Sequence, residues 1–320
     1  MNPTFDAHTH VWEHQWQDFV VGTGGRGNRS QCDLLLALMD RNGVERACVI
    51  GGCDETNHRN NDFVAELCRE RPDRFVMLSE ISLTADNREE LLARTLNDWP
   101  ALGLRYFAAP DERPDTWSGP EHTSFWEKAD ASKLIVALNL GPNQAAGLTP
   151  LVRDYPNIRW LLDHMARPRY DMDDAAYQPV LDLAGFPNVF VKISAWYAFT
   201  ADVAEYPYDD LARFVVALRD AYGARRLLWG SDALPVLDFS SYTQSCSCLR
   251  HIPALSEDDL TWIPGKTAEE LFSHSRKFLS LHGRRRWFNF CRIHHHSPRL
   301  GRRGFLRHRG LVSRFRGQFS

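Results

Sequence analysis

The chain of 320 residues has no run of eighteen or more apolar residues, which excludes a membrane-spanning helix of ordinary length. Residues 1–6 also lack the basic segment and apolar core that begin a secretory signal. The seven cysteines are odd in number and scattered, and Cys246-x-Cys248 has no matching second pair. This pattern favours reduced thiols over disulfides, and we therefore expect a cytoplasmic protein.

Acidic residues are missing altogether from one end of the chain. Residues 273–320 hold thirteen Lys or Arg, six His and no Asp or Glu, which gives this segment a formal charge of +13. Because the whole chain has a net charge of −3, residues 1–272 carry −16. Such different compositions argue against one uniform fold. We expect a single domain over residues 1–272 and a poorly ordered, Arg- and His-rich extension over residues 273–320.

Residues 1–272 show no internal repeat and instead alternate between two kinds of segment. Eight short runs are rich in apolar, β-branched or aromatic residues, as expected for strands of a buried parallel sheet: 4–11, 47–51, 75–81, 103–107, 134–140, 158–164, 189–194 and 227–232. Amphipathic segments separate them. Their end signals include Asp33 as an N-cap, Gly223 in a left-handed C-terminal position, and a capping box at Thr267-x-x-Glu270.

Eight strands alternating with helices are typical of an α/β protein with a (β/α)₈ TIM barrel, which we expect here as a single domain. The alternative is a doubly wound open sheet, which usually has a Gly-rich phosphate turn after its first strand. This sequence has His8-Thr9-His10 at that place instead.

In such a barrel the carboxyl ends of the strands form the active-site face. His8 and His10 lie one pleat apart, so both imidazoles project from one face of the first strand. His164 ends the sixth predicted strand and Asp232 ends the eighth. Any one of these histidines could be a satisfied core residue. Together, the four residues predict a shared site, because a buried carboxylate needs imidazoles, a metal or a polar substrate as its partner.

The segments around these residues resemble the amidohydrolase superfamily, in particular its amidohydrolase 2 branch of lactonases and non-oxidative decarboxylases. The resemblance covers about residues 4–272 and rests on Phe5-Asp-Ala-His-Thr-His-Val-Trp12, Leu161-Leu-Asp-His-Met-Ala-Arg-Pro168, Val189-Phe-Val-Lys-Ile-Ser194 and Leu228-Trp-Gly-Ser-Asp232. It implies a distorted (β/α)₈ barrel that hydrolyses a carbonyl bond, with four catalytic or metal-binding residues: His8, His10, His164 and Asp232.

The sequence departs from the family pattern in one place that bears on the metal. Metal-dependent members commonly have a further ligand, a His or a carboxylated Lys, at the end of the fifth strand, where this sequence has Asn139. A neutral amide is a poor ligand for zinc. The resemblance therefore implies either a metal-free site, which we favour, or one divalent cation, Zn²⁺ or Mn²⁺, held by His8, His10, His164 and Asp232.

The same mechanism is expected in both cases, the hydrolysis of a sugar-acid or pyrone-type lactone. Asp232 would act as general base on a water molecule that attacks the lactone carbonyl. His8 and His10, or a metal that they hold, would stabilise the oxyanion. His164 would hydrogen-bond the carbonyl or assist the leaving alkoxide.

Further residues near the strand ends are candidates for binding a lactone or carboxylate substrate. Arg105 ends the fourth strand and could clamp a carboxylate, or it could form a salt bridge within the barrel mouth. Lys192 shares the inward parity of Ser194, where a structural ion pair is the alternative to a substrate contact. Asn139 is a further candidate, and Trp196 and Tyr197, just past the seventh strand, would provide an apolar wall for a ring of the substrate.

Two loops could also reach this site. Arg167 and Arg169 follow His164 in a loop, although most loop arginines are solvated. Residues 12–31 contain several glycines and two tryptophans, and a loop of this length after the first strand is predicted to be a lid.

Two other functions stay open. A metal-dependent decarboxylase of aromatic or unsaturated acids is disfavoured, because many of these enzymes begin with Glu-x-His and this sequence has no His on its fifth strand. Nucleic-acid binding is suggested by residues 284–316, which interleave arginines with aromatic residues. A shifted reading frame at the end of the gene would give the same composition, so we do not expect nucleic acid as a partner. The sequence does not determine the oligomeric state, and a homo-oligomer is one alternative.

Overall fold

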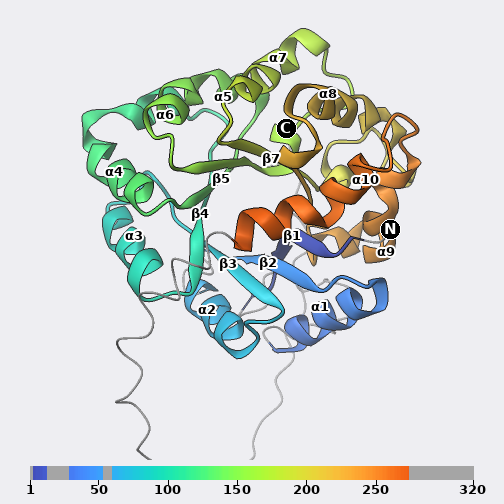
Figure 1. Ribbon diagram of the computed structural model, residues 1–320, viewed down its shortest axis with the longest axis horizontal. Helices are drawn as coiled ribbons and strands as arrows, with labels where there is room; N and C mark the ends of the chain where they lie inside the picture. Colours follow the sequence, from blue (N-terminus) through green and yellow to red (C-terminus); the bar gives the residue numbers. More distant parts are fainter. Residues whose placement is uncertain (1–2, 13–28, 53–59, 274–320) are drawn as a thin grey trace, which may run out of the picture.

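The structure, a computed structural model, describes residues 3–12, 29–52 and 60–273. Its eight strands are parallel and follow one another in chain order around a single sheet. Figure 1 shows the sheet at the centre of a ring of helices. The strands are β1 Phe5–His10, β2 Arg46–Ile50, β3 Phe75–Glu80, β4 Ala101–Phe107, β5 Ile135–Asn139, β6 Arg159–Leu162, β7 Val189–Ile193 and β8 Leu227–Trp229. The prediction of a (β/α)₈ barrel is confirmed.

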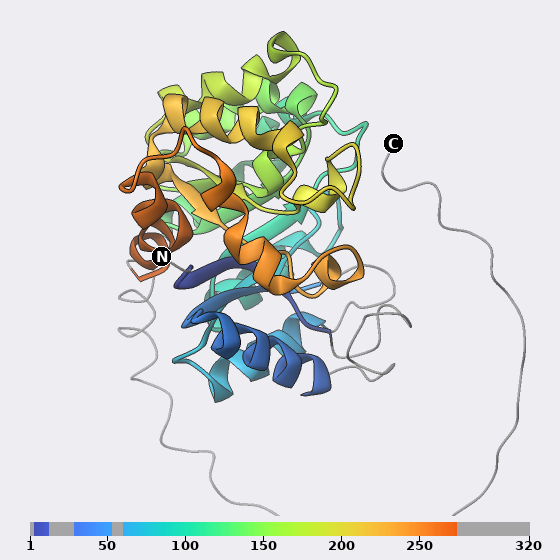
Figure 2. The same cartoon turned by 90° about the vertical axis from the view of Figure 1, so that its right-hand side faces the viewer.

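Helices cover the outside of the barrel, with at least one between each pair of consecutive strands. In Figures 1 and 2, α1 and α2 flank one side of the barrel, while α7 and α8 flank the opposite side. The helices are α1 Arg29–Asn42, α2 Asn60–Glu70, α3 Arg88–Asn97, α4 Thr123–Ala131, α5 Pro142–Ala145, α6 Thr149–Asp154, α7 Asp174–Asp182, α8 Ala212–Tyr222, α9 Tyr242–Ser247 and α10 Asp259–Thr261.

Two of the predicted helix ends are wrong and one is only partly right. Helix α1 begins at Arg29 rather than at Asp33, and in its first turn the side chain of Gln31 accepts a hydrogen bond from the Trp12 N–H. Thr267 does not open a helix. A π-helical turn precedes it without a break, and its hydroxyl donates to the Ala224 carbonyl. Gly223 has the expected positive φ of 73° but an extended ψ of 152°.

The barrel is distorted at the seam between its first and last strands. The β1–β2 register shifts between Asp6 and Thr9, and β8 is only three residues long. The seam between β1 and β8 is closed by one isolated bridge between Thr9 on β1 and Ala233, just after β8. Next to it, the Asp232 N–H donates a hydrogen bond to the His8 carbonyl. A Cβ on Gly230 would lie 2.8 Å from the His8 Cβ, so glycine is needed for this close approach.

The apolar core has two layers. An inner cluster fills the barrel, from Phe5 and Ala7 on β1 to Leu228 on β8, while a larger outer cluster lies between the strands and the helices. The helical segment 259–273 adds Phe272, which stacks on Phe5 with ring centroids 5.2 Å apart. Burying each of these rings contributes about 1.5–3 kcal/mol.

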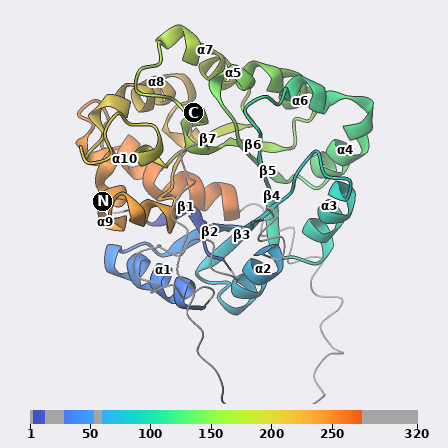
Figure 3. The same ribbon diagram turned by 180° about the vertical axis from the view of Figure 1, so that it is seen from behind.

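The segment 259–273, drawn in orange, crosses in front of the strands in Figure 1 and lies behind them in Figure 3. It therefore covers the amino-terminal end of the barrel, where the Thr4 N–H donates to the Pro264 carbonyl. The carboxyl ends of the strands lie at the opposite end.

The structure also bears on the thiols and on the membrane. None of the five described cysteines forms a disulfide, and all five are buried: Cys32, Cys48, Cys68, Cys246 and Cys248. Within the described ranges, no helix is both long and apolar enough to cross a membrane. The predicted lid falls mostly on residues 13–28 and the basic extension on residues 274–320, both outside the described residues.

Candidate active site

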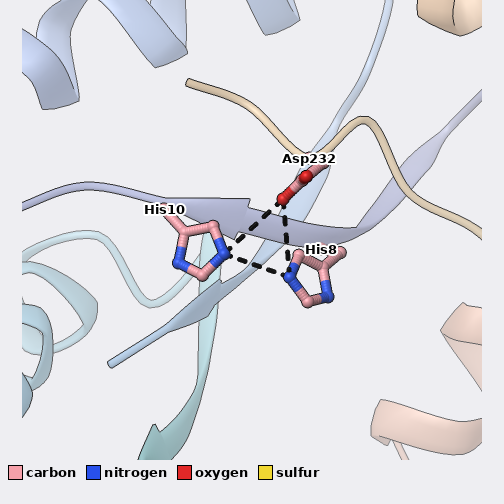
Figure 4. A group of neighbouring side chains, drawn as sticks. All are labelled: His8, His10 and Asp232. Atoms are coloured by element: carbon pink, nitrogen blue, oxygen red, sulfur yellow. Dashed lines mark hydrogen bonds and ion pairs between the residues drawn. The ribbon is translucent and has the colours of Figure 1, made fainter. Parts of the chain in front are cut away.

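Three of the four predicted catalytic residues converge where β1 and β8 end, and Figure 4 shows their side chains pointing toward one another. The Nε2 atoms of His8 and His10 are 3.1 Å apart. Each Nε2 atom lies 3.6 Å from Oδ1 of Asp232. We call these three residues, His8, His10 and Asp232, the triad corner.

The backbone around Asp232 fixes its carboxylate in this corner. Asp232 has a left-handed φ of 59°, an uncommon conformation for a residue other than glycine, and its N–H donates to the His8 carbonyl at 2.9 Å. The Tyr197 hydroxyl donates to Oδ2 at 2.6 Å, which leaves Oδ1 facing the two imidazoles. The carboxylate is thus oriented by groups on both sides.

Asp6 links the first strand of the barrel to the segment that follows the last strand. Its Oδ1 accepts the N–H groups of His8 at 3.2 Å and Ser231 at 2.8 Å. Its Oδ2 accepts the hydroxyl of Tyr242 on α9 at 2.9 Å. Because Ser231 precedes Asp232 in the chain, this one carboxylate positions both the first and the last strand of the site.

The fourth predicted residue, His164, lies beside His8, with ring centroids 4.5 Å apart. Its Nδ1 is 2.8 Å from the Ser194 hydroxyl, which orients the ring. From His164 to Arg167 four consecutive residues have positive φ values of 54–58°. Such a run of left-handed residues is costly and turns the chain sharply at the end of β6, which directs His164 toward β7 and β1.

A chain of buried charges lies next to the histidines. Asp163 accepts from the Arg105 guanidinium at 3.1 Å and lies 3.0 Å from the Lys192 ammonium. Arg105 also pairs with Glu80 at 3.0 Å. Lys192 and Asp163 are fully buried. The two cations and two carboxylates balance, which makes their burial tolerable.

The imidazoles are uncharged near neutral pH. Burial lowers the pKa of His10 to about 4. Burial and the neighbouring Lys192 ammonium hold the pKa of His8 well below its ordinary range. Burial also lowers the pKa of His164. The three rings can therefore accept or donate hydrogen bonds as neutral groups.

Burial raises the pKa of each carboxylate, and the three differ in the neighbouring groups that offset it. Burial alone would raise the pKa of Asp232, but the three imidazoles and the Tyr197 hydroxyl outweigh it and lower the pKa. Lys192 likewise outweighs burial at Asp163, whose pKa lies well below its usual range. Asp6 has no cation beside it among the described residues, and burial raises its pKa to about 6. Asp232 is therefore ionised at neutral pH, as a general base must be.

The triad corner fits a divalent cation in the kind and spacing of its donors. His Nε2 and carboxylate oxygen are good ligands for zinc, and tetrahedral coordination at about 2.0–2.1 Å places ligand atoms roughly 3.3–3.4 Å apart. The three separations here, 3.1, 3.6 and 3.6 Å, are close to this value. His164 belongs to a second group, with His8 and Asp163, where the Lys192 ammonium already lies against the carboxylate.

The residues predicted to bind substrate lie in different surroundings. Arg105 and Lys192 point into the barrel, but both are paired with carboxylates. Asn139 follows Ile135 and Ala137 of the inner cluster on the same face of β5, and its Oδ1 is buried without a hydrogen-bond partner among the described residues. Trp196 packs in the outer cluster, and its Nε1 likewise has no described partner.

Sequence reasoning missed several residues of this site. Asp163 stands next to His164 in the quoted motif, but its role as the partner of Lys192 and Arg105 was not predicted. Tyr197 was predicted as an apolar wall, and its hydroxyl instead binds Asp232. Side-chain parity on β6 could have identified Asp163, because Leu161, two residues earlier, lies in the inner cluster.

Comparisons with known proteins place this chain in a family. The amidohydrolase 2 family model, described as Amidohydrolase, matches residues 5–273. L-fucono-1,5-lactonase of Burkholderia ambifaria is 25% identical over 238 residues, which cover 71% of this chain and 79% of the lactonase.

Solved structures share the fold at lower identity. An amidohydrolase of Burkholderia multivorans with bound zinc has a TM-score of 0.68 at 22% identity and covers 85% of this chain and 99% of its own. A probable 2-pyrone-4,6-dicarboxylic acid hydrolase of Acinetobacter baumannii with bound citric acid has a TM-score of 0.66 at 18% identity, with coverage of 85% and 100%. A dihydroxybenzoic acid decarboxylase of Polaromonas with bound manganese has a TM-score of 0.62 at 17% identity, with coverage of 87% and 99%.

The family model spans the whole barrel, from the first residue of β1 to the end of the segment 259–273. The fold and the family match therefore agree. The chain belongs to the amidohydrolase 2 family and is an enzyme of the amidohydrolase superfamily.

Proposed function

We propose that this enzyme hydrolyses a lactone, with Asp232 as the general base. The observation that carries the proposal is the geometry of the Asp232 carboxylate, which is oriented by Tyr197 and faces the imidazoles of His8 and His10. The lowered pKa of Asp232 agrees with a role as base. The similarity to an L-fucono-1,5-lactonase supports a sugar-acid lactone as the substrate class, and the pyrone hydrolase structure keeps a pyrone-type lactone in consideration.

The first step would be attack of water on the lactone carbonyl. Asp232 takes a proton from the water through Oδ1, the oxygen that Tyr197 leaves free. The water oxygen forms a bond to the carbonyl carbon, and the carbonyl oxygen becomes an oxyanion. General-base catalysis of this kind contributes about 10²–10⁴-fold to the rate.

The imidazoles would stabilise the charge that develops in this step. A neutral histidine donates from one ring nitrogen, so His8 and His164 can offer N–H groups to the oxyanion or the ring oxygen. When the tetrahedral intermediate collapses, the carbon–oxygen bond of the ring breaks. The alkoxide takes back the proton that Asp232 removed from water, either directly or relayed through His164, and the product is a hydroxy acid.

A divalent cation would be held by His8, His10 and Asp232, the donors whose spacing fits it. When bound, it would polarise the carbonyl as a Lewis acid. We propose that the chain's own groups suffice, since no histidine or acidic side chain stands at Asn139 to complete the ligand set.

Substrate contacts are assigned to polar groups that lack protein partners. Asn139 Oδ1 and Trp196 Nε1 are buried and could bind hydroxyl groups of a sugar lactone. Arg167, half-buried above the Phe107 ring at 5.6 Å, pairs with none of the described carboxylates and would bind a carboxylate or hydroxyl of the substrate. Arg105 and Lys192 are proposed to hold the site together, because Glu80 and Asp163 already occupy them.

The proposal is tested by assaying purified protein on a panel of sugar-acid and pyrone lactones and of aromatic acids, with and without a chelator. We expect lactone opening that survives chelation. Release of CO₂ from an aromatic acid, abolished by the chelator and restored by Mn²⁺, would instead establish the decarboxylase alternative, which the fold similarity to such enzymes leaves open. Absence of hydrolysis across the lactones would reject the proposal.

A further inference from the structure

The Lys192 ammonium contacts His8, one of the two histidines of the triad corner. Its Nζ lies 3.2 Å from Nδ1 of His8 and 3.0 Å from Oδ1 of Asp163. All three side chains are fully buried. The ammonium and the imidazole are therefore in direct hydrogen-bond contact.

In this hydrogen bond, Lys192 can only be the donor and His8 the acceptor. An ammonium group has three donors and no acceptor, so Nδ1 of His8 must present its lone pair to Lys192. The competing partner for Nδ1 is Oδ1 of Asp163, at 3.6 Å. That separation is too long for a hydrogen bond. Nδ1 of His8 thus carries no proton.

The proton of neutral His8 is then on Nε2, which faces the triad corner. Nε2 of His8 lies 3.1 Å from Nε2 of His10, so His10 must accept there and carry its own proton on Nδ1. One lysine contact therefore determines the tautomers of both imidazoles.

We infer that Lys192 is a positioning residue that holds His8 as the Nε2–H tautomer and so places a proton in the triad corner where a bound metal would need the Nε2 lone pair. A cation in this corner needs the Nε2 lone pairs of both histidines. A metal-bound histidine almost always donates its other N–H to an acceptor, whereas Nδ1 of His8 faces a cation. The inference does not depend on which substrate the enzyme takes.

The first test is the ¹⁵N NMR spectrum of histidine-labelled, metal-free wild-type protein, with the His8 signals assigned from their loss in His8→Gln. We expect the signature of a protonated Nε2 and an unprotonated Nδ1. A protonated Nδ1 in the wild type would overturn the inference, and this readout requires no variant of Lys192.

The second test is zinc affinity, measured by titration calorimetry on wild type, Lys192→Met and the matched control Arg105→Met. Both substitutions remove one cation from Asp163, but only Lys192 touches His8. We expect Lys192→Met to bind Zn²⁺ at least about tenfold more tightly, the lower bound for outer-shell effects on metal affinity, and Arg105→Met to match the wild type. Equal affinities for the two variants would overturn the inference.

Discussion

Replacing Asp6 by Asn tests how a buried carboxylate holds the barrel seam. The amide oxygen of the introduced Asn can still accept the N–H groups of His8 and Ser231, and its NH₂ group can donate to the Tyr242 hydroxyl. The substitution therefore keeps the hydrogen bonds and removes only the charge. We expect a folded variant whose stability relative to the wild type depends on pH.

The size of this dependence follows from the pKa of Asp6, which burial raises from 3.8 to about 6. The folded state thus holds this proton more tightly than the unfolded state does. As pH rises through this interval the wild type loses stability, while the amide in Asp6→Asn does not titrate. At about 1.4 kcal/mol per pKa unit, the wild type loses about 3 kcal/mol relative to the variant between about pH 4 and pH 7.

Urea unfolding, followed by circular dichroism at several pH values, measures this difference. The buried histidines titrate in both proteins, so their contributions cancel when the free energies of unfolding are subtracted. A difference that stays constant over the whole range would refute the assignment of a raised pKa to Asp6.

Three further predictions concern the active site. Tyr197→Phe removes the hydrogen bond that lowers the pKa of Asp232, so the acid limb of the kcat/KM profile should move to higher pH; an unmoved limb would exclude Asp232 as the group titrating there. Ser194→Ala removes the partner of His164 Nδ1, which should lower kcat about tenfold at a stability loss of about 1 kcal/mol; unchanged kcat in a stopped assay would exclude an orienting role. Arg167→Met should raise KM about tenfold for a carboxylate-bearing lactone but not for a neutral one, and equal KM changes for the two lactones would contradict a carboxylate contact.

The strands could be predicted from the sequence because each is a short, largely apolar run, and the site because polar residues stand at or just after the carboxyl ends of several of them. His8, His10, His164 and Asp232 were placed at such ends, and the structure brings them close together. The irregular register of β1 could not be predicted from side-chain alternation. The register shift after Asp6 places Ala7 in the inner cluster while the next residue, His8, contacts Lys192 inside the barrel.

Contacts between distant segments could not be predicted. Asp6 binds Tyr242, which is 236 residues away, and nothing in the local sequence of either residue indicates the pair. The two proposed roles of Lys192 could not be separated for a similar reason, since only the structure shows Asp163 beside it. Local patterns therefore locate the chemistry, while the charge pairs and tautomers that tune it depend on tertiary packing.

The central claim is that Asp232 activates water for lactone hydrolysis without a metal. The most direct measurement compares kcat of chelator-treated wild type and Asp232→Asn on the best lactone of the panel. We predict that the wild type stays active and that the variant loses about 10²–10⁴-fold in kcat while KM changes little. Near-normal kcat in Asp232→Asn, or a wild type that is inactive until Zn²⁺ is restored, would contradict the account.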